Sequence, residues 1–482
     1  MCGITGGIGP SAPSKQLLDA QLISLQHRGP DDSGTYVNAG IGLGMGRLAI
    51  VEIAAGKQPA SDASEQINMV FNGEIYNYRE LRHELEQSGI HCRTSSESEV
   101  IINLYLKYGL DFIGKLNGMF AIAIHDARDN SLHLIRDRMG KKPLWISQLS
   151  DGTLFFASEV RALMLARPDR TLRTDMVAEV MQYGYINAPH SAFNEIGQLP
   201  PASLLTWREG KTSTSTYWVP DFDTKVDISY EDALETTKEL IEESVARRLI
   251  SERPLGSFLS GGYDSTIVTS YMAKLMSEKV QTYSIGFHSA QYNEAHHAKQ
   301  VANYLGTNHH EEILSPDPAL VVEKIAHVLD QPLADSSIVP TYLLAKFARE
   351  NLIVALGGDG GDEVFGGYDR YLATPILQGL NPILGIAKFG LRLVDKKVLG
   401  KGRKINRASS QLNQKDSLAH RFSSIHSLAQ PEDLAILLTP GINSDAGSKI
   451  FMKEFNAGDI SSFERMIRSD LTSYLPGDLL VK

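Results

Sequence analysis

Cys2 is the first residue of this 482-residue sequence whose position and chemistry together indicate catalysis. Removal of Met1 would leave a free α-amine on the same residue as a thiol. Because an α-amine has a reference pKa near ~8, it can accept the thiol proton near neutral pH and so activate its own nucleophile. A cysteine at position 2 also occurs without any function, and its position alone does not separate the two interpretations.

A second candidate for chemistry is the sequence PLGSFLSGGYDSTIV, which starts at Pro254. Leu255–Leu259 has the apolar character of a strand, two glycines interrupt it, and apolar residues then recur at helical spacing. A strand, a glycine turn and a helix N-terminus together can bind phosphate, since the backbone approaches closely and the helix N–H groups favour negative charge. An ordinary glycine turn with a serine cap fits the same pattern. The candidate phosphate-binding residues are Ser260, Gly261, Gly262, Asp264 and Ser265.

A glycine-rich loop, Gly357–Tyr368, forms the third candidate. It follows the apolar run Leu352–Leu356, which is typical of a strand buried in a parallel sheet. Asp359, Asp362 and Glu363 offer carboxylates for Mg²⁺, and the glycines allow the backbone to approach a substrate. Ligands of open parallel sheets bind outside the carboxyl ends of the strands. We therefore expect this loop and the Ser260 turn to lie at the same edge of one sheet.

The SGGYDS string resembles the SGGxDS signature of the PP-loop ATP pyrophosphatases, which cleave ATP to AMP and pyrophosphate while adenylating an acid. It lacks the spacing and the lysine of a Walker loop, which disfavours γ-phosphate transfer. The later glycine loop resembles a segment of glutamine-hydrolysing asparagine synthetases. Asp359 stands where those enzymes commonly carry a glutamate tied to formation of β-aspartyl-AMP, so the identity of the acid stays open. Beyond the turn itself, the resemblance implies ATP contacts at Leu259, Ile285, Gly357 and Gly358, and Mg²⁺ contacts at Asp264 and Asp362.

The first half of the chain resembles the glutaminase domain of class II glutamine amidotransferases, an N-terminal nucleophile hydrolase. Cys2 is followed in order by HRGPDDSG from His27, RLAIV from Arg47 and NGEIYN from Asn72. The resemblance implies that Cys2 attacks the side-chain amide of glutamine and that Asn72 and Gly73 supply the oxyanion hole. Arg47 would pair with the substrate carboxylate through its guanidinium fork. The glutamine-binding residues implied are Arg47, Leu48, Ala49, Ile50, Val51, Asn72, Gly73, Glu74 and Glu97.

Glu97 departs from the family pattern, because a shorter aspartate usually stands there. It keeps the negative charge that the glutamine ammonium needs, and we expect weaker glutamine binding from the added methylene. A further family segment, RDRMGKKPL from Arg136, carries cations that resemble a phosphate site. We interpret it as structural and close to the domain interface.

The elements that must position these residues differ between the two halves. In the first half, residues 68–71, 119–125, 132–136 and 153–157 have strand patterns, and 79–86 and 98–108 have helical ones. Antiparallel sheets covered by helices fit this order, as in the αββα fold of N-terminal nucleophile hydrolases. In the second half, strands near 255–259, 280–285, 311–314 and 352–356 alternate with helices, which predicts a doubly wound α/β domain. A helix opened by Ser229 with Asp232 and carrying one mostly apolar face should precede the first of these strands.

The boundary between the halves falls near Trp218–Asp223, where no periodic pattern remains. We predict a glutaminase domain over 1–215 and an ATP-binding domain over 225–482. Two segments, Asp330-Gln331-Pro332 and Ala334–Ser337, match the asparagine synthetase pattern and are expected near the acid substrate. The histidine pairs that begin at His296 and His309 lack further ligands at metal spacing, and we expect exposed or packed side chains.

Composition excludes several classes of protein. The net charge of −10 argues against a nucleic-acid partner, and no apolar run reaches the ~18–20 residues that cross a bilayer. There are two cysteines, Cys2 and Cys92, without a CxxC motif, which fits a reducing cytosol. The basic stretch Lys388–Arg407 is expected to be a solvated helical face.

As a whole, the chain resembles the glutamine-hydrolysing asparagine synthetases from Cys2 to its last residues. This implies that one domain releases ammonia from glutamine, an internal passage carries it, and the other traps it on an acyl-adenylate made from ATP and aspartate with Mg²⁺. Another acceptor, such as a sugar acid, stays open, and so do glutaminase activity alone and a homodimer. The last residues, up to Lys482, match the segment before a family block with a catalytic basic residue, and without that block we expect impaired ATP chemistry.

Overall fold

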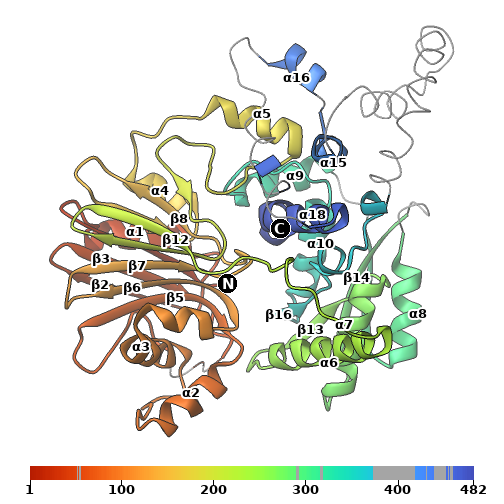
Figure 1. Ribbon diagram of the computed structural model, residues 1–482, viewed down its shortest axis with the longest axis horizontal. Coiled ribbons are helices and arrows are strands. Elements are labelled where there is room, and N and C mark those ends of the chain that lie inside the picture. Colours follow the sequence, from red (N-terminus) through yellow and green to blue (C-terminus); the bar gives the residue numbers. More distant parts are fainter. Residues whose placement is uncertain are drawn as a thin grey trace.

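The computed structural model describes the chain except for residues 52, 54–55, 289–292, 315–317, 373–417, 430, 439–451, 454 and 456–459. The basic stretch Lys388–Arg407 therefore lies outside the described residues. Figure 1 shows the chain as two bodies, with stacked sheets on the left and a smaller sheet surrounded by helices on the right. No helix among the described residues combines the length and the apolar character needed to cross a membrane.

Two six-stranded antiparallel sheets form the first body. The first sheet has the order β10-β8-β9-β1-β3-β2 and the second β12-β11-β7-β6-β5-β4. The strands of the first are β1 (Gly3–Ile8), β2 (Asp32–Asn38), β3 (Ile41–Arg47), β8 (Trp145–Gln148), β9 (Leu154–Ala157) and β10 (Gly197–Gln198). Those of the second are β4 (Ala60–Ser61), β5 (Ile67–Ile75), β6 (Gly118–Asp126), β7 (Ser131–Arg136), β11 (Ser203–Arg208) and β12 (Lys211–Thr216).

The two sheets pack face to face, and helices cover their outer faces. Ile4 and Leu43 of the first sheet share one buried cluster with Val70 and Leu134 of the second. Helices α1 (Lys15–Ser24) and α4 (Val160–Ala166) lie on the first sheet, and α2 (Tyr78–Gln87) and α3 (Glu97–Tyr108) on the second. The expected αββα arrangement is confirmed (Figure 1). A 3₁₀-helix, η1 (Gly109–Lys115), and α5 (Thr174–Tyr183) complete the helices of this body.

The strands predicted from apolar patterns are confirmed as β5, β6, β7 and β9. In β5, Met69 and Phe71 face α2 and α3, whereas Val70 faces the other sheet. Both faces of this strand are therefore buried, which explains why Met69, Val70 and Phe71 are apolar in succession rather than alternating with polar residues.

The second body contains a four-stranded parallel sheet in the order β15-β14-β13-β16. Its strands are β13 (Leu255–Phe258), β14 (Gln281–Phe287), β15 (Asn308–Leu314) and β16 (Val354–Leu356). After β13, the chain adds β14 and β15 on one side and then returns to place β16 on the other side. The point at which the strand order reverses lies between β13 and β16, and crevices at such points are where open α/β sheets bind ligands.

Helices cover both faces of this sheet, which confirms the doubly wound fold. Helix α6 (Tyr230–Arg248) packs with α7 (Tyr263–Leu275) on one face, whereas α10 (Ile338–Ala348) packs on the other. Ser229 caps α6 by accepting from Asp232 N, as expected. The predicted apolar face of α6 is only partly buried: Val245 is in the core, but Leu240 is 60% exposed. The remaining helices are α8 (Ala295–Leu305), α9 (Pro318–Val328), α11 (Gly361–Phe365), α15 (Leu418–His426), α16 (Pro431–Leu437), α18 (Ser462–Ser469), η2 (Asp470–Tyr474), α19 (Leu475–Gly477) and η3 (Leu479–Val481).

Candidate active sites and the cavity between them

Cys2 lies directly before β1, where its thiol meets the loop that follows β3. Its Sγ is 3.4 Å from Leu48 N and 3.6 Å from Leu48 O, so the thiol both accepts from and donates to one residue of that loop. Burial raises the pKa of the Cys2 thiol, although the Leu48 N–H opposes the shift. A proton acceptor is therefore needed before this sulfur can act as a nucleophile.

Of the nine residues predicted to bind glutamine, all except Ala49 and Asn72 line a pocket together with Cys2. A small pocket of about 40 Å³ lies between the end of β3, the middle of β5 and the start of α3. Arg47 at its wall donates to Ile53 O at 3.1 Å and to Val51 O at 3.3 Å. The sequence-predicted residues that line this pocket are Cys2, Arg47, Leu48, Ile50, Val51, Gly73, Glu74 and Glu97.

Asn72 has an unusual environment on β5. Its side chain is 1% exposed, and neither its Nδ2 nor its Oδ1 has a hydrogen-bond partner among the described residues. Buried polar groups are normally paired, so an orphaned amide next to a pocket is typical of a group that binds a substrate. Gly73 follows, and a Cβ on it would lie 2.0 Å from Met119 O, so no other residue fits there without a shift of the strand.

Charged groups near Cys2 have strongly shifted pKa values. Burial raises the pKa of Glu74 to about 7, against the opposing charge of Lys142. Burial lowers the pKa of Lys142 to about 8, with Arg28 adding to the shift. Glu97 Oε1 accepts from Ile75 N at 2.9 Å, which connects α3 to the end of β5.

Lys142 belongs to the RDRMGKKPL segment, for which the sequence predicts a structural role. That assignment is confirmed for Arg136, which is fully buried and donates to the carbonyls of Gly140, Lys142 and Leu199. Asp137 accepts from four backbone N–H groups and so shapes the same turn. The sequence did not single out Lys142 itself, because nothing in its spacing shows that this turn lies beside Cys2.

The SGGYDS turn joins β13 to α7, as predicted. Gly261 has φ +86°, a conformation that favours glycine. The Ser260 and Ser265 hydroxyls are 3.0 Å apart, and Ser260 Oγ also accepts from Gly262 N at 3.2 Å. The two serines therefore hold the turn in shape as well as offering polar atoms to a ligand.

The second glycine loop meets this turn at the same edge of the sheet, which confirms the expectation from the parallel-sheet rule. A Cβ on Gly358 would lie 2.6 Å from Asp264 Cβ, and one on Gly361 would lie 2.6 Å from Asp264 Cγ. Burial raises the pKa of Asp264, and the charges of Asp362 and Asp359 raise it further. Three carboxylates thus gather where β13 and β16 end.

Below this loop, a buried polar network fixes the chain that follows. Tyr368 donates to Glu363 Oε1 at 2.6 Å, and the Arg370 guanidinium lies 3.6 Å from the centre of the Tyr368 ring. Arg370 also pairs with the buried Asp470 at 2.8 Å. The carboxylate of Glu363 is therefore used by its own protein rather than offered to a ligand.

A cavity of about 970 Å³ separates the two candidate sites and is lined by both bodies. It shares Ile50, Val51, Glu74 and Glu97 with the pocket beside Cys2. At its other end it reaches Asp264 and the loop Gly357–Gly361. Met139 and Lys141 also line it, so the RDRMGKKPL segment lies at the domain interface as expected.

Some predicted residues lie elsewhere. Leu259 and Ile285 are not among the described residues that line the cavity, and Leu259 is buried against Ala298 and Ala302 of α8. The carboxylate of Asp330, a residue expected near the acid substrate, accepts from the backbone N–H groups of Val160 and Arg161 in the first body. His309 and His310 are packed within the sheet, and His296 and His297 are exposed, as predicted.

Comparisons with known proteins assign a family to each body. The glutamine amidotransferase domain family matches residues 1–218, and the asparagine synthase family matches residues 236–482. The asparagine synthetase (glutamine-hydrolyzing) 1 of Bacillus subtilis is 35% identical over 378 residues, which cover 77% of this chain and 59% of that protein. A relative of the same family name from Methanocaldococcus jannaschii is 33% identical over 401 residues, which cover 77% of this chain and 76% of that protein. The chain thus spans less than two thirds of the length of the first of these relatives.

Proposed function

This chain belongs to the glutamine-hydrolysing asparagine synthetase family, and from that membership we propose that it makes asparagine from aspartate, ATP and the amide nitrogen of glutamine. We assign glutamine hydrolysis to residues 1–215 and ATP-dependent activation of aspartate to residues 225–482. Glutamine and water give glutamate and ammonia. Aspartate and ATP give β-aspartyl-AMP and pyrophosphate, and ammonia then displaces AMP.

In the first reaction, the Cys2 sulfur attacks the glutamine amide carbon after its proton passes to the α-amine that removal of Met1 exposes. The oxyanion forms beside the Asn72 amide and the Gly73 N–H, and ammonia leaves when the thioester forms. Water then releases glutamate. The unpartnered Asn72 side chain supports this assignment, because it is free to donate when the oxyanion appears.

The glutamine main-chain groups bind to the charged wall of the pocket. Arg47 exchanges its present contacts with Val51 O and Ile53 O for the substrate carboxylate, which fits its fork of donors. Glu74 and Glu97 receive the substrate ammonium. Leu48, Ala49, Ile50 and Val51 complete the site through the loop that already contacts the Cys2 thiol.

In the second reaction, the Ser260–Ser265 turn and Gly357–Gly358 bind the phosphates of ATP. We keep Leu259 and Ile285, which lie outside the cavity, as contacts of its base. The chemistry of the donors fits Mg²⁺, which commonly takes one or two protein carboxylates and completes its shell with phosphate oxygens and water. Asp264 and Asp362 would hold the ion, which would neutralise the pyrophosphate leaving group. Among the described residues, no group of three or more histidine, cysteine or acidic side chains is arranged to hold a metal without such help. Asp359 lies next to this pair and is assigned to the activated acid.

The observation that carries the proposal is the cavity between the two sites. Ammonia is neutral and small, and side chains such as Met119, Ile241 and Val268 give this cavity a partly apolar wall, beside the acidic groups that the two sites contribute to it. We propose that ammonia crosses this cavity to reach the adenylate. The two free cysteines, Cys2 and Cys92, and the substrates support a cytosolic location. We further propose that the protein is a homodimer.

The test uses the full chain with ATP, Mg²⁺, aspartate and glutamine labelled with ¹⁵N in its amide, in a buffer that contains unlabelled ammonium. Mass spectrometry should find AMP, pyrophosphate and asparagine that carries mostly ¹⁵N. Label diluted to the level of the bulk ammonium would contradict internal transfer. If AMP forms only with another acid, such as a sugar acid, that acid and not aspartate is the acceptor. If glutamate forms without AMP, the chain has glutaminase activity only.

A further inference from the structure

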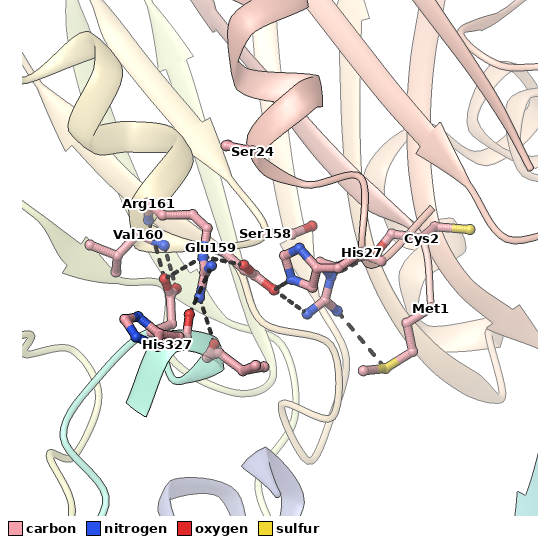
Figure 2. Close-up of polar contacts among 12 residues, drawn as sticks. Met1, Cys2, Ser24, His27, Ser158, Glu159, Val160, Arg161 and His327 are labelled. Carbon is pink, nitrogen blue, oxygen red and sulfur yellow. Dashed lines mark hydrogen bonds and ion pairs between the residues drawn. The ribbon is translucent and has the colours of Figure 1, made fainter. Parts of the chain in front are cut away.

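A chain of ion pairs and hydrogen bonds crosses from the glutaminase nucleophile into the second body, and the buried Glu159 stands at its centre. Figure 2 shows the Glu159 carboxylate between His27 on one side and Arg161 on the other, with Cys2 and Met1 beyond His27. Glu159 is 5% exposed and directly precedes α4. The side chains of His27, Arg28 and Arg161 all contact this one carboxylate.

The first partner connects Glu159 to Cys2. Arg28 Nη1 donates to Glu159 Oε1 at 2.9 Å, and Arg28 Nε donates to the backbone carbonyl of Cys2 at 3.0 Å. The neighbouring Ser158 hydroxyl accepts from Ile4 N at 2.9 Å. The backbone carbonyl of the nucleophile and the start of the strand that follows it are therefore held by residues that belong to, or depend on, the segment 158–159.

The second partner connects Glu159 to the other body. Arg161 Nε lies 2.9 Å from Glu159 Oε2, and the same guanidinium donates to Val328 O at 2.6 Å and to His327 O at 3.3 Å. Asp330 accepts from the backbone N–H groups of Val160 and Arg161, the latter at 3.1 Å. A short helix of the glutaminase domain thus receives its capping carboxylate from the ATP-binding domain.

The segment that supplies Asp330 is also connected to the predicted ATP turn. It joins α9 to α10, and α10 packs with Phe347 and Ala348 against Phe258, the last residue of β13. The Ser260 turn begins two residues later. A displacement of this segment during the ATP reaction would therefore change the capping of α4 and the position of Glu159.

We infer that Glu159 and Asp330 are positioning residues for the Cys2 nucleophile, acting through Arg28, so that the second domain completes the glutaminase site. The inference rests on the proposed glutaminase reaction. Arg28 contacts the Cys2 backbone rather than the small pocket that would receive glutamine, so loss of Glu159 or Asp330 should lower kcat for glutamine more than it raises KM.

The experiment compares Glu159→Gln, Asp330→Asn and the double variant in the full chain. Asp169→Asn is the matched control, since Asp169 also pairs with an arginine next to α4 but is 64% exposed on its side chain and makes no contact toward Cys2. We measure glutamate release with its kcat and KM, ammonia-dependent AMP formation, and iodoacetamide labelling of each cysteine by peptide mass spectrometry. Cys92 is the internal reporter of folding, because it lies in the same domain away from Arg28.

Each single variant should lose between about ten-fold and about 10²-fold in kcat for glutamine, with KM changed less than about three-fold, because the nucleophile is misplaced but the pocket is intact. Ammonia-dependent AMP formation should stay near the wild-type rate. Cys2 should label faster as its backbone loosens, while Cys92 labels at the wild-type rate. The double variant should lose no more than the worse single one, since both residues act through the same contact.

Wild-type kcat in both single variants would overturn the inference. A fall in kcat of the double variant equal to the product of the two single falls would overturn it as well. Faster labelling of Cys92 together with Cys2 would overturn it too, because it would indicate general destabilisation. If the wild type releases no glutamate, the proposed function fails by itself. The labelling of Cys2 still tests the positioning role in that case, and equal rates in wild type and variants would reject it.

Discussion

Asn72→Ala is the substitution for which the structure makes the sharpest prediction. Both polar atoms of the buried Asn72 amide lack partners among the described residues, so truncation breaks no hydrogen bond of the resting protein. A buried unsatisfied group costs about 1–3 kcal/mol, and its removal should leave the free energy of unfolding unchanged or slightly higher. Loss of one oxyanion donor should, in contrast, lower kcat for glutamine by about 10²–10³-fold, or about 2.7–4 kcal/mol of transition-state stabilisation.

Asn68→Ala is a matched control on the same strand. Asn68 is equally buried, but its Oδ1 accepts from Ser61 Oγ at 2.7 Å and its Nδ2 donates to Glu65 O at 3.2 Å. Loss of two hydrogen bonds at about 1 kcal/mol each should destabilise the fold by roughly 2 kcal/mol, with kcat close to wild type.

The assays are glutamate release with saturating glutamine and urea unfolding followed by tryptophan fluorescence. The two substitutions should therefore show opposite patterns, one in turnover and one in stability. Asn72→Ala with kcat within about three-fold of wild type would refute the oxyanion role. Equal destabilisation by the two variants would refute the argument that the Asn72 amide has no structural partner.

Three further predictions concern the two sites and their independence. Cys2→Ala should abolish glutamate release but leave ammonia-dependent AMP formation unchanged, and loss of both in a folded protein would contradict separate sites. Gly358→Ala places a Cβ 2.6 Å from Asp264 Cβ, so it should abolish AMP formation while glutamate release stays within about two-fold of wild type. Normal AMP formation in this variant would show that the two loops need not meet. Burial raises the pKa of Glu74 to about 7, so the negative charge that the glutamine ammonium needs is present above that pH and lost below it. KM for glutamine should therefore rise as the pH falls through about 7, and a Glu74→Gln variant should show a high KM that does not change over this pH range.

Much of the fold could be predicted because the apolar residues that mark a strand or helix in the sequence are also the residues that the folded element buries. The apolar run at Leu352–Leu356 and the glycines after it predicted β16 and the loop that meets the Ser260 turn. The α6 face was predicted less well, because the periodicity at Leu240 does not say whether another element covers it. Amphipathic spacing identifies a face that avoids water, but the partner depends on how whole elements assemble.

The sequence alone determined the types and the order of the reactive residues. Cys2, the Asn72-Gly73 pair and the SGGYDS turn could be assigned from motifs, since each lies within a short segment whose conformation is set locally by glycine and by strand or helix pattern. The tertiary structure decided which of them share an environment. Asp330 lies 170 positions from Val160 yet binds its N–H, and the pKa values of Glu74 and Lys142 are shifted mainly by burial, which exists only after the sheets have packed. Electrostatic interactions depend on distance and on exclusion of water, and neither can be obtained from residue spacing along the chain.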